Sequence, residues 1–368
     1  MRLAAARARM ARLEFARPVF TSHGEFTSRG SVILALEDLE GRCGYGEAAP
    51  WPGFGTESEA QALAALEDVA ELLAGADVEP GECPVVAASR LGNAPAARAA
   101  LEGALWDLAA RRAGRSLAAH LVESCVAPLA RRDGVADRAA LGEVPVSALL
   151  IERSPDALRR EAASVRAAGY RAAKMKLGGG SLDEDCARAR AAREGLGEGF
   201  RLRGDANGAW TESDARQALQ SLAEFGFEYL EQPVAPGDEM ALARLRRLGL
   251  VRIAADESVA TGRDARRLVE SGAVDVLVLK PAMLGGPARA LEIANLARRS
   301  GCDVVFSHAF ESAVGARHAL HCAAAWADPV ACHGLCTAGL FVNDIAEPVA
   351  CRKGVAVVAS SPGLGITL

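Results

Sequence analysis

The sequence predicts an α/β protein that joins a parallel β/α barrel to a smaller α+β module. The chain has 368 residues and is half hydrophobic, which is enough for a barrel of roughly 200–250 residues and a second unit. In its later part, short apolar runs alternate with helical stretches rich in Ala and Arg. Charged residues close successive runs at intervals of 24 to 29 residues, the length of a strand, a loop and a helix. Repeated units of this kind form parallel strands that close into a barrel.

The N-terminal module is expected to span residues 1–140. A short basic tail leads into antiparallel strands from about Leu13 to Tyr45, where apolar and polar residues alternate between turns. The polar segment Phe20–Gly30, which contains His23, is either a mobile loop over a site or an ordinary hairpin. The proline- and glycine-rich loop Gly46–Ser58 adds apolar side chains. Helices are expected at residues 57–74, 95–113 and 116–122.

The barrel is expected at residues 141–345, with eight strands and seven full helices. Residues 346–368 form a strand-like C-terminal segment that returns to the first module. Helical stretches between the strands start at Asp, Ser or Pro and end at Gly. The expected strands are residues 144–150, 171–178, 201–207, 229–233, 252–258, 274–281, 303–309 and, with the weakest pattern, 331–337.

Three acidic residues close neighbouring strands of this barrel: Asp205, Glu231 and Asp256. The carboxyl ends of barrel strands meet at one mouth, so these carboxylates converge if they face inward. Three close carboxylates repel one another unless a cation lies between them. Oxygen ligands with room for water and substrate suit Mg²⁺ better than zinc, with Mn²⁺ as a possible substitute.

Lysines flank the acidic series on both sides. Lys174 and Lys176 share one face of their strand because residues two apart point the same way. Lys280 closes a strand beyond the acids. Ammonium groups beside a cation disfavour one another's protonation, which suits Lys176 as a base for abstracting a proton next to a carboxylate. The alternative is salt bridges on a barrel rim, and five charged residues on five consecutive strands argue against it.

Further polar residues are weaker candidates. Arg203 and Asn207 share the inward face of Asp205, and Ser307 or Ser312 could donate hydrogen bonds to a substrate carboxylate. His308 closes the seventh strand, but a lone His is more often structural. Cys332, His333 and Cys336 only faintly resemble a zinc site.

Composition excludes several function classes. Net charge is −5 with both signs interspersed, so no basic face predicts nucleic-acid binding. No apolar run reaches the length of a membrane span. Nine cysteines without a CxxC motif indicate reduced thiols in a cytoplasmic protein. The oligomeric state is left open.

The series KMK (Lys174–Lys176), DAN (Asp205–Asn207), EQP (Glu231–Pro233), DES (Asp256–Ser258) and KPAMLGG (Lys280–Gly286) resembles the enolase superfamily, in its muconate-lactonizing subgroup. The resemblance implies a modified TIM barrel, (β/α)7β, with residues 1–140 as an N-terminal α+β capping domain. The mandelate-racemase subgroup is a poorer match, because it would pair the seventh-strand His with an acid where Lys280 stands.

Within the subgroup, the loop GEAAPWPGFGTES, the DANGAW stretch and KPAMLGG resemble the o-succinylbenzoate synthase family. That resemblance implies a carbon–oxygen lyase of menaquinone biosynthesis, which dehydrates 2-succinyl-6-hydroxy-2,4-cyclohexadiene-1-carboxylate to 2-succinylbenzoate. It assigns Mg²⁺ to the three acids listed above, proton removal to Lys176 and enediolate stabilisation to Lys280. The supporting or substrate-binding residues would be Lys174, Arg203, Asn207, Ser307 and His23.

Two alternatives stay open. The two lysines would also suit an N-succinylamino-acid racemase or another cycloisomerase or epimerase of the subgroup. A dipeptide epimerase would need paired acids on the eighth strand, and HGLCTAGL (His333–Leu340) has none. A non-catalytic binding protein on a decayed barrel would lack a lysine or an acid of the series, and none is missing.

Overall fold

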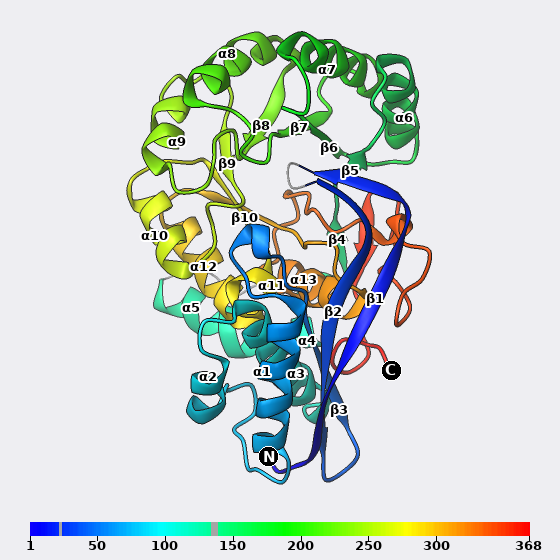
Figure 1. Cartoon of the computed structure of the whole chain (residues 1–368), viewed down its shortest axis with the longest axis vertical. Helices are drawn as coiled ribbons and strands as arrows, with labels where there is room; N and C mark the ends of the chain where they lie inside the picture. Colours follow the sequence, from blue (N-terminus) through cyan, green and yellow to red (C-terminus); the bar gives the residue numbers. More distant parts are fainter. Residues whose placement is uncertain (22–23, 134–138) are drawn as a thin grey trace.

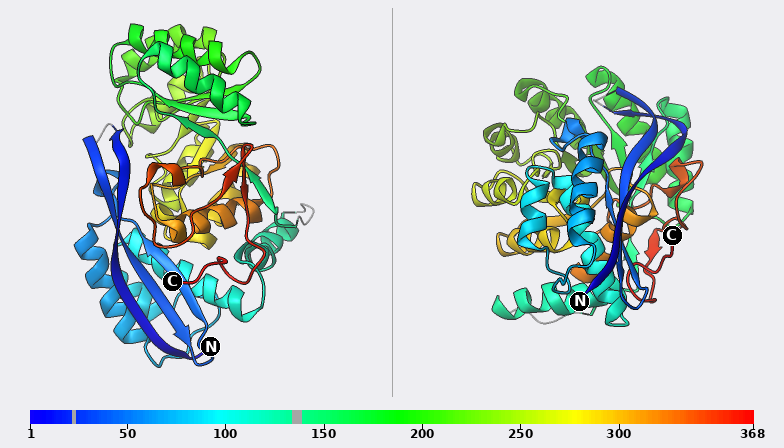
Figure 2. Two further views of the ribbon diagram at one scale, coloured as in Figure 1. Left: turned by 90° about the vertical axis from the view of Figure 1, so that its right-hand side faces the viewer. Right: turned by 60° about the horizontal axis from the view of Figure 1, so that its bottom comes forward.

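The computed structural model describes residues 1–21, 24–133 and 139–368, so His23 lies outside the described residues. A capping domain and a curled parallel sheet surrounded by helices make up the molecule (Figure 1). Figure 2 shows the two parts stacked along the longest axis, with the N-terminus in the lower one. The predicted fold class, an α/β protein with a curled parallel sheet and an N-terminal capping domain, is confirmed.

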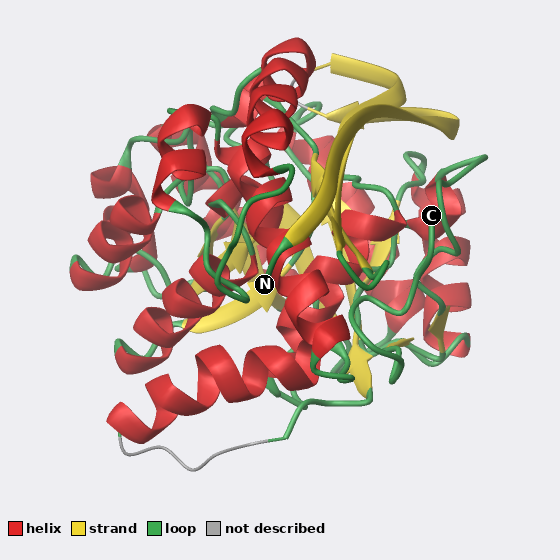
Figure 3. Ribbon diagram, turned by 90° about the horizontal axis from the view of Figure 1, so that it is seen from below, coloured by secondary structure: helices red, strands yellow, loops and turns green. Residues whose placement is uncertain are grey.

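The capping domain is built on an antiparallel sheet of β1 (Leu3–Thr21), β2 (Gly24–Asp38) and β3 (Cys43–Ala48). β1 and β2 form the long bent hairpin seen in Figure 3. β1 begins at Leu3, so the expected basic tail is wrong. Small alanines on the inner face, such as Ala6 and Ala8, pack against the cap core and alternate with exposed arginines. Alanine gives a weak alternation signal, which hides the strand in the sequence.

Several helices follow this sheet in the chain, and the two longest of them, at residues 59–73 and 95–112, pack against it. They are α1 (Glu59–Leu73), α2 (Val85–Leu91), α3 (Pro95–Arg112), α4 (Leu117–Leu121), a π-helical turn (Val122–Val126) and α5 (Ala127–Arg132). α2 was not expected. Ser58 and Gln61 cap the start of α1 reciprocally. β3 approaches α3 closely because Gly46 has no side chain; a Cβ there would lie 1.8 Å from the Ala100 carbonyl oxygen.

The barrel sheet has seven parallel strands in the order β11-β10-β9-β8-β7-β6-β5. They are β5 (Ala148–Leu150), β6 (Ala172–Lys176), β7 (Arg201–Asp205), β8 (Phe227–Glu231), β9 (Ile253–Ala255), β10 (Val276–Leu279) and β11 (Asp303–Phe306). The helices between and after them are α6 (Pro155–Ala167), α7 (Leu182–Leu196), α8 (Glu212–Leu222), α9 (Glu239–Arg246), α10 (Gly262–Glu270), α11 (Pro281–Leu284), α12 (Pro287–Arg299) and α13 (Ala313–Trp326). α6 to α10 form an outer arc around the strands (Figure 1).

Closure of the barrel differs from the expectation in two places. The expected first strand, residues 144–150, is split: β4 (Glu143–Pro145) pairs with β13 (Val355–Val357), which also pairs with β12 (Cys351–Arg352). The expected eighth strand, residues 331–337, forms only single bridges, from His333 to Val146 and from Gly334 to Ser307. These bridges still link the two edges of the curled sheet. One residue on each side is too few for a regular strand.

The C-terminal residues return to the cap. The Asp107 carboxylate on α3 accepts hydrogen bonds from the backbone N–H groups of Tyr45 and Leu364, at 2.9 and 2.7 Å. Arg111 donates to the Ile366 carbonyl oxygen at 2.7 Å. These contacts join α3, β3 and the last residues of the chain. The domain boundaries at residues 140 and 345 stay predictions.

No helix within the described residues has the length and apolar character needed to cross a bilayer.

Candidate active site

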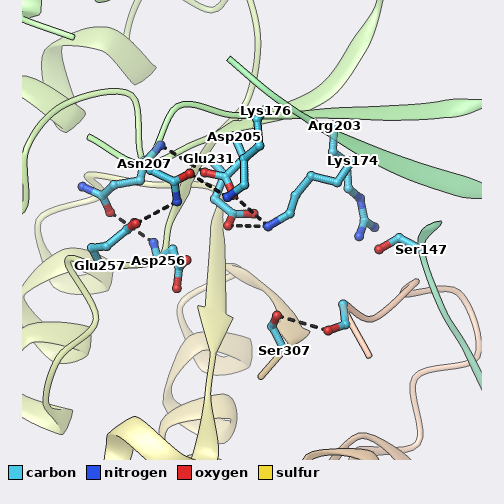
Figure 4. Close-up of polar contacts among 12 residues, drawn as sticks. Ser147, Lys174, Lys176, Arg203, Asp205, Asn207, Glu231, Asp256, Glu257 and Ser307 are labelled. Carbon is cyan, nitrogen blue, oxygen red and sulfur yellow. Dashed lines mark hydrogen bonds and ion pairs between the residues drawn. The ribbon is translucent and has the colours of Figure 1, made fainter. Parts of the chain in front are cut away.

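The charged residues of the series meet at the carboxyl ends of the barrel strands. In the strand register Lys176 stands opposite Asp205, and Asp205 opposite Glu231. Asp256 follows the end of β9, and Lys280 follows the end of β10. Side chains two residues earlier on the same strands face the barrel interior. In strand order the mouth therefore carries a lysine, three carboxylates and a second lysine. Figure 4 shows Lys176 and the three carboxylates of this row.

Ion pairs connect this row. The Lys176 ammonium lies 2.8 Å from Asp205 Oδ2 and donates to Asn207 Oδ1 at 2.6 Å. Lys174 Nζ lies 2.9 Å from both Asp205 Oδ2 and Glu231 Oε1. At the other end of the row, Lys280 Nζ lies 2.6 Å from Asp256 Oδ2. Lys174 thus sits centrally, while the two outer lysines bracket the carboxylates.

Burial makes these charges interact strongly. Asp205 and Glu231 are almost fully buried. Burial raises the pKa of Glu231 to about 8, and the neighbouring Asp205 charge adds to the rise, while Lys174 opposes it. Burial also works against a charged Asp205, but Lys174 and Lys176 outweigh it and lower the pKa of that carboxyl far below its usual range.

Backbone strain is concentrated at the same mouth. Asn207 and Gln232, which follow the ends of β7 and β8, have φ values of 46° and 38°, rare for residues with side chains. Gln232 is fully buried; its Oε1 accepts from the backbone N–H groups of Asp256 and Ser258, both at 3.1 Å. Strain of this kind persists where surrounding contacts hold the backbone. Gln232 therefore fixes the backbone that carries Asp256.

A cavity of about 740 Å³, measured out to open solvent, opens over the charged row. Its apolar wall comes from the cap loop and from the residues after β11. The rings of Trp51 and Phe54 pack edge to face, with their centroids 5.5 Å apart. The ring centroids of Trp51 and Phe310 are 6.0 Å apart. The Lys280 ammonium lies 4.3 Å from the Phe54 ring centroid, a cation–π contact. The sequence marked this loop as apolar but gave no sign that it reaches Lys280.

Polar side chains line another part of the cavity. His308 Nε2 lies 2.9 Å from Thr337 Oγ1, and His308 Nδ1 lies 3.1 Å from the buried Glu311 carboxylate. Ser307 also lines the cavity, and its hydroxyl donates to the Gly334 carbonyl oxygen at 3.2 Å. The pairing of His308 with Glu311 was missed, although HAFES places an acid three residues after the His.

Two predicted candidates lie away from the cavity. Arg203 extends away from the carboxylates in Figure 4; it donates to Cys332 O at 2.6 Å and to Glu228 Oε2 at 2.5 Å. It does not line the cavity. Ser312 caps α13, and its hydroxyl donates to Glu47 at 2.5 Å. Both therefore join segments of the fold in this structure.

The donor set fits a magnesium ion. Within the described residues no three carboxylate, imidazole or thiol groups form a ready metal cluster. The Lys174 ammonium lies between Asp205 and Glu231, 2.9 Å from an oxygen of each. The three carboxylates nevertheless come from neighbouring strands and supply only oxygen donors, which Mg²⁺ prefers. Burial raises the pKa of Glu231 and the Asp205 charge adds to the rise, and a divalent cation beside these carboxylates would favour their charged forms.

Comparison with known families identifies the class. The "Enolase C-terminal domain-like" family matches residues 157–368, and the "Mandelate racemase / muconate lactonizing enzyme, N-terminal domain" family matches residues 5–121. The chain belongs to the enolase superfamily, in its muconate-lactonizing branch.

Individual relatives differ in their reactions. An o-succinylbenzoate synthase from Mycolicibacterium smegmatis is 42% identical over 225 residues, 60% of this chain, and the match spans 64% of that synthase. A hydrophobic dipeptide epimerase from Enterococcus faecalis is 30% identical over 347 residues, which cover 94% of this chain and 93% of the epimerase.

The similar solved structures also include enzymes with different reactions. A dipeptide epimerase from Enterococcus faecalis V583, complexed with Mg and the dipeptide L-Leu-L-Tyr, has a TM-score of 0.87 at 27% identity and full coverage of both chains. A muconate lactonizing enzyme from Pseudomonas fluorescens, complexed with muconolactone, has a TM-score of 0.87 at 26% identity, covering 100% of this chain and 96% of that one. These proteins act on small molecules.

Proposed function

We propose that this protein is an o-succinylbenzoate synthase. The reaction removes water from 2-succinyl-6-hydroxy-2,4-cyclohexadiene-1-carboxylate and yields 2-succinylbenzoate. The observation that carries the proposal is the cavity between Lys176 and Lys280, with Asp205 and Asp256 in its floor and aromatic rings above it. Similarity to synthases at 40–42% identity over more than half of the chain supports the same reaction.

The chain's own residues divide the work. Lys176 removes the proton on the carbon that bears the carboxylate. It then returns that proton to the hydroxyl group leaving from the same face, so that one water molecule departs and the ring becomes aromatic. Lys280 stays protonated on the other side and stabilises the enediolate by its charge. Burial opposes that charge, but Asp256 and Glu257 outweigh it and raise the pKa of Lys280.

Asp205, Glu231 and Asp256 would hold Mg²⁺. When bound there, the ion supplies positive charge that polarises the substrate carboxylate and makes the adjacent proton more acidic. Lys174, which contacts two of these acids, orients them. Asn207 positions the Lys176 amine through its 2.6 Å contact.

The cavity wall argues against a dipeptide substrate. A dipeptide carries an ammonium group that needs a carboxylate partner. Among the described residues that line the cavity, the carboxylates are Asp205 and Asp256, and both are paired with lysines. The part of the wall formed by the segment after α13 presents Gly334, Cys336 and Thr337 in place of acids.

A second candidate is an N-succinylamino-acid racemase. Such a substrate has no free α-ammonium, and two lysines on opposite sides can exchange its α-proton from either face. A solved N-succinyl Arg/Lys racemase from Bacillus cereus supports this candidate, with a TM-score of 0.87 at 25% identity.

Parallel assays with Mg²⁺ test the proposal. Loss of the cyclohexadiene absorbance with formation of 2-succinylbenzoate is the expected result. Solvent-deuterium exchange into N-succinyl amino acids or dipeptides, with the diene left unchanged, would instead identify a racemase or epimerase. Wild-type protein and the same preparation treated with a chelator serve as a matched pair.

A further inference from the structure

The proposed reaction uses only one end of the cavity. The three carboxylates belong to β7, β8 and the end of β9, in the middle of the sheet, whereas Ser307 and His308 follow β11 at its edge. In a sheet curled into a barrel, the middle strands lie across from the edge strands. Gly334 bridges to Ser307, so the segment that carries Thr337 lies at the same edge. We call the part of the cavity lined by Ser307, His308, Gly334 and Thr337 its distal end.

The lysines of the cavity are committed to the carboxylates. Among the described residues that line it, the lysines are Lys174, Lys176 and Lys280. The ammonium group of each lies within 2.9 Å of an oxygen of one of the three carboxylates. A ligand group at the distal end therefore has to be recognised by hydroxyl groups or by the His308 imidazole.

Of the three hydroxyl groups among the described lining residues, two already donate to the backbone. The hydroxyls of Ser147 and Ser307 donate to carbonyl oxygens at 3.4 and 3.2 Å. The third hydroxyl, that of Thr337, lies 2.9 Å from His308 Nε2. The direction of the Thr337 proton is therefore decided by His308.

Glu311 in turn fixes the imidazole of His308. The Glu311 carboxylate is buried, accepts from the Ala309 N–H at 2.7 Å and lies 3.1 Å from His308 Nδ1. Burial opposes the charge on Glu311, but His308 and Arg29 outweigh it and lower the pKa of that carboxyl. Because a charged carboxylate can only accept, the nitrogen that faces it, Nδ1, carries a proton. Nε2 is left to face Thr337.

We propose that Glu311, His308 and Thr337 form a chain of hydrogen bonds that binds the terminal carboxylate of a succinyl group, with the Thr337 hydroxyl in direct contact. With protons on both ring nitrogens, Nδ1–H donates to Glu311 and Nε2–H donates to Thr337 Oγ1, so the hydroxyl proton turns into the cavity. With Nε2 unprotonated, the ring would accept that proton and leave only oxygen lone pairs towards the ligand. An anionic ligand group selects the first arrangement. His308 is thus a positioning residue that acts through Thr337.

This inference rests on the proposed function, because it takes the substrate to carry a succinyl group. The substrates of both candidate reactions, the synthase and the N-succinylamino-acid racemase, end in such a carboxylate. Each also has a second carboxylate, next to the carbon that loses its proton. A substrate of this class therefore has one anionic group for the three acids and their cation and another for the distal end.

Equilibrium binding of two ligands in the presence of Mg²⁺ tests the contact with Thr337. 2-Succinylbenzoate carries the terminal carboxylate, and 2-butanoylbenzoate carries a methyl group in its place. Wild-type protein should bind 2-succinylbenzoate more tightly. Thr337→Val keeps the shape of the side chain; it should weaken binding of 2-succinylbenzoate by roughly 10–100-fold and leave that of 2-butanoylbenzoate unchanged.

Thr337→Ser keeps the hydroxyl and is the matched control, so its affinity for both ligands should stay close to that of the wild type. Equal weakening of both ligands in Thr337→Val, or weakening of neither, would overturn the proposal.

Two replacements of His308 test its positioning role. His308→Gln keeps an N–H donor that can reach Thr337, and it should retain most of the preference for 2-succinylbenzoate. His308→Leu has no donor and should lose as much of that preference as Thr337→Val. Adding Thr337→Val to His308→Leu should cause no further loss, because the two residues act as one unit. Equal losses in the Gln and Leu variants, or additive losses in the double variant, would reject the positioning role. Circular dichroism checks that each variant is folded.

Turnover separates this inference from the proposed function. Wild-type protein that leaves the cyclohexadiene unchanged, yet prefers 2-succinylbenzoate and loses the preference in Thr337→Val, would reject the synthase reaction and support the distal contact. Turnover of the cyclohexadiene without a preference between the two ligands would support the reaction and overturn the contact. Absence of the preference overturns the contact whether or not turnover is seen.

Discussion

On β8 to β11, two layers of side chains inside the barrel differ in character, whereas β6 and β7 carry Lys174 and Arg203 at the level of the lower layer. The lower layer is apolar and consists of Tyr229, Ala254, Val276, Val278 and Val305. The upper layer lies two residues further along each strand and carries Glu231, Asp256, Lys280 and Ser307. Both layers face the same way because side chains alternate along a strand.

The difference shows how one scaffold separates stability from chemistry. The apolar layer is stabilised by removal of its surface from water, at about 25 cal/mol per Å². The charged layer gains no such term, and burial of its carboxylates is unfavourable, as the pKa of Glu231 at about 8 shows. The upper layer therefore persists because the lower one and the outer helices hold the strands in place.

Removing the amine of Lys176 should give the largest effect on activity. Lys176→Ala is expected to reduce kcat by about 10²–10⁴-fold or more, since a positioned general base contributes that much. Its melting temperature should stay close to that of the wild type. Lys353→Asn is the matched control: it removes an exposed ammonium, and Asn tolerates the positive φ of 51° at that position. Turnover near the wild-type rate in Lys176→Ala would exclude Lys176 as the base.

A change in the charged layer should affect metal binding more than folding. Glu231→Gln removes one anionic oxygen donor from the centre of the row. Calorimetry should show Mg²⁺ affinity weakened by at least the roughly 10–100-fold that loss of an outer-shell partner costs. Glu270→Gln, on the exposed surface of α10, is the control. Equal affinity in Glu231→Gln and the wild type would remove Glu231 from the ligand set.

Glu102 tests the cost of a buried carboxylate away from the mouth. Burial raises its pKa from 4.5 to about 7, although it accepts a 2.7 Å hydrogen bond from the Ala288 N–H at the start of α12. Because the folded-state pKa is raised, its contribution to stability is fully present below pH 4.5. That contribution is lost as pH rises through 7, by about 3 kcal/mol in all.

Glu102→Gln keeps an acceptor oxygen and cannot ionise. Melting temperatures measured at pH 5 and pH 8 should therefore differ less in this variant than in the wild type. The exposed Glu270→Gln should keep the wild-type difference. If the melting temperature of Glu102→Gln depended on pH as strongly as that of the wild type, ionisation of Glu102 would not destabilise the fold.

A change in the apolar layer should have the smallest effect. It should lower the stability of the fold and leave Mg²⁺ binding unchanged. Val278→Ala removes two methyl groups from a buried site, which should destabilise the fold by about 2 kcal/mol. The urea midpoint should fall while Mg²⁺ affinity stays unchanged. Weaker Mg²⁺ binding at unaltered stability would contradict the separation of the two layers.

Much of the mouth could be predicted from the sequence. Each charged residue closes a short apolar run, so strand period and the barrel rule were sufficient to bring Lys176, Asp205, Glu231 and Lys280 to one mouth. The roles of these residues stay predictions. Contacts between distant segments could not be predicted, because no periodicity encodes them. Phe54 over Lys280 is one example, and the pairing of β4 with β13 is another.

Two other errors have local causes. Alanine has little hydrophobic contrast with its neighbours, so the first part of β1 was read as a tail. The segment 331–337 has a strand-like composition, but it pairs through His333 and Gly334 alone. Its function as a link between sheet edges depends on the curvature of the whole sheet, which the segment's own sequence does not contain.

A crystal structure of the protein soaked in Mn²⁺ tests the central claim most directly, since anomalous scattering locates that ion. The account predicts one strong peak bound by Asp205, Glu231 and Asp256, with Lys176 and Lys280 on opposite sides of the cavity above it. A peak bound elsewhere, or an ion that leaves any of these three carboxylates outside its ligand set, would contradict the account.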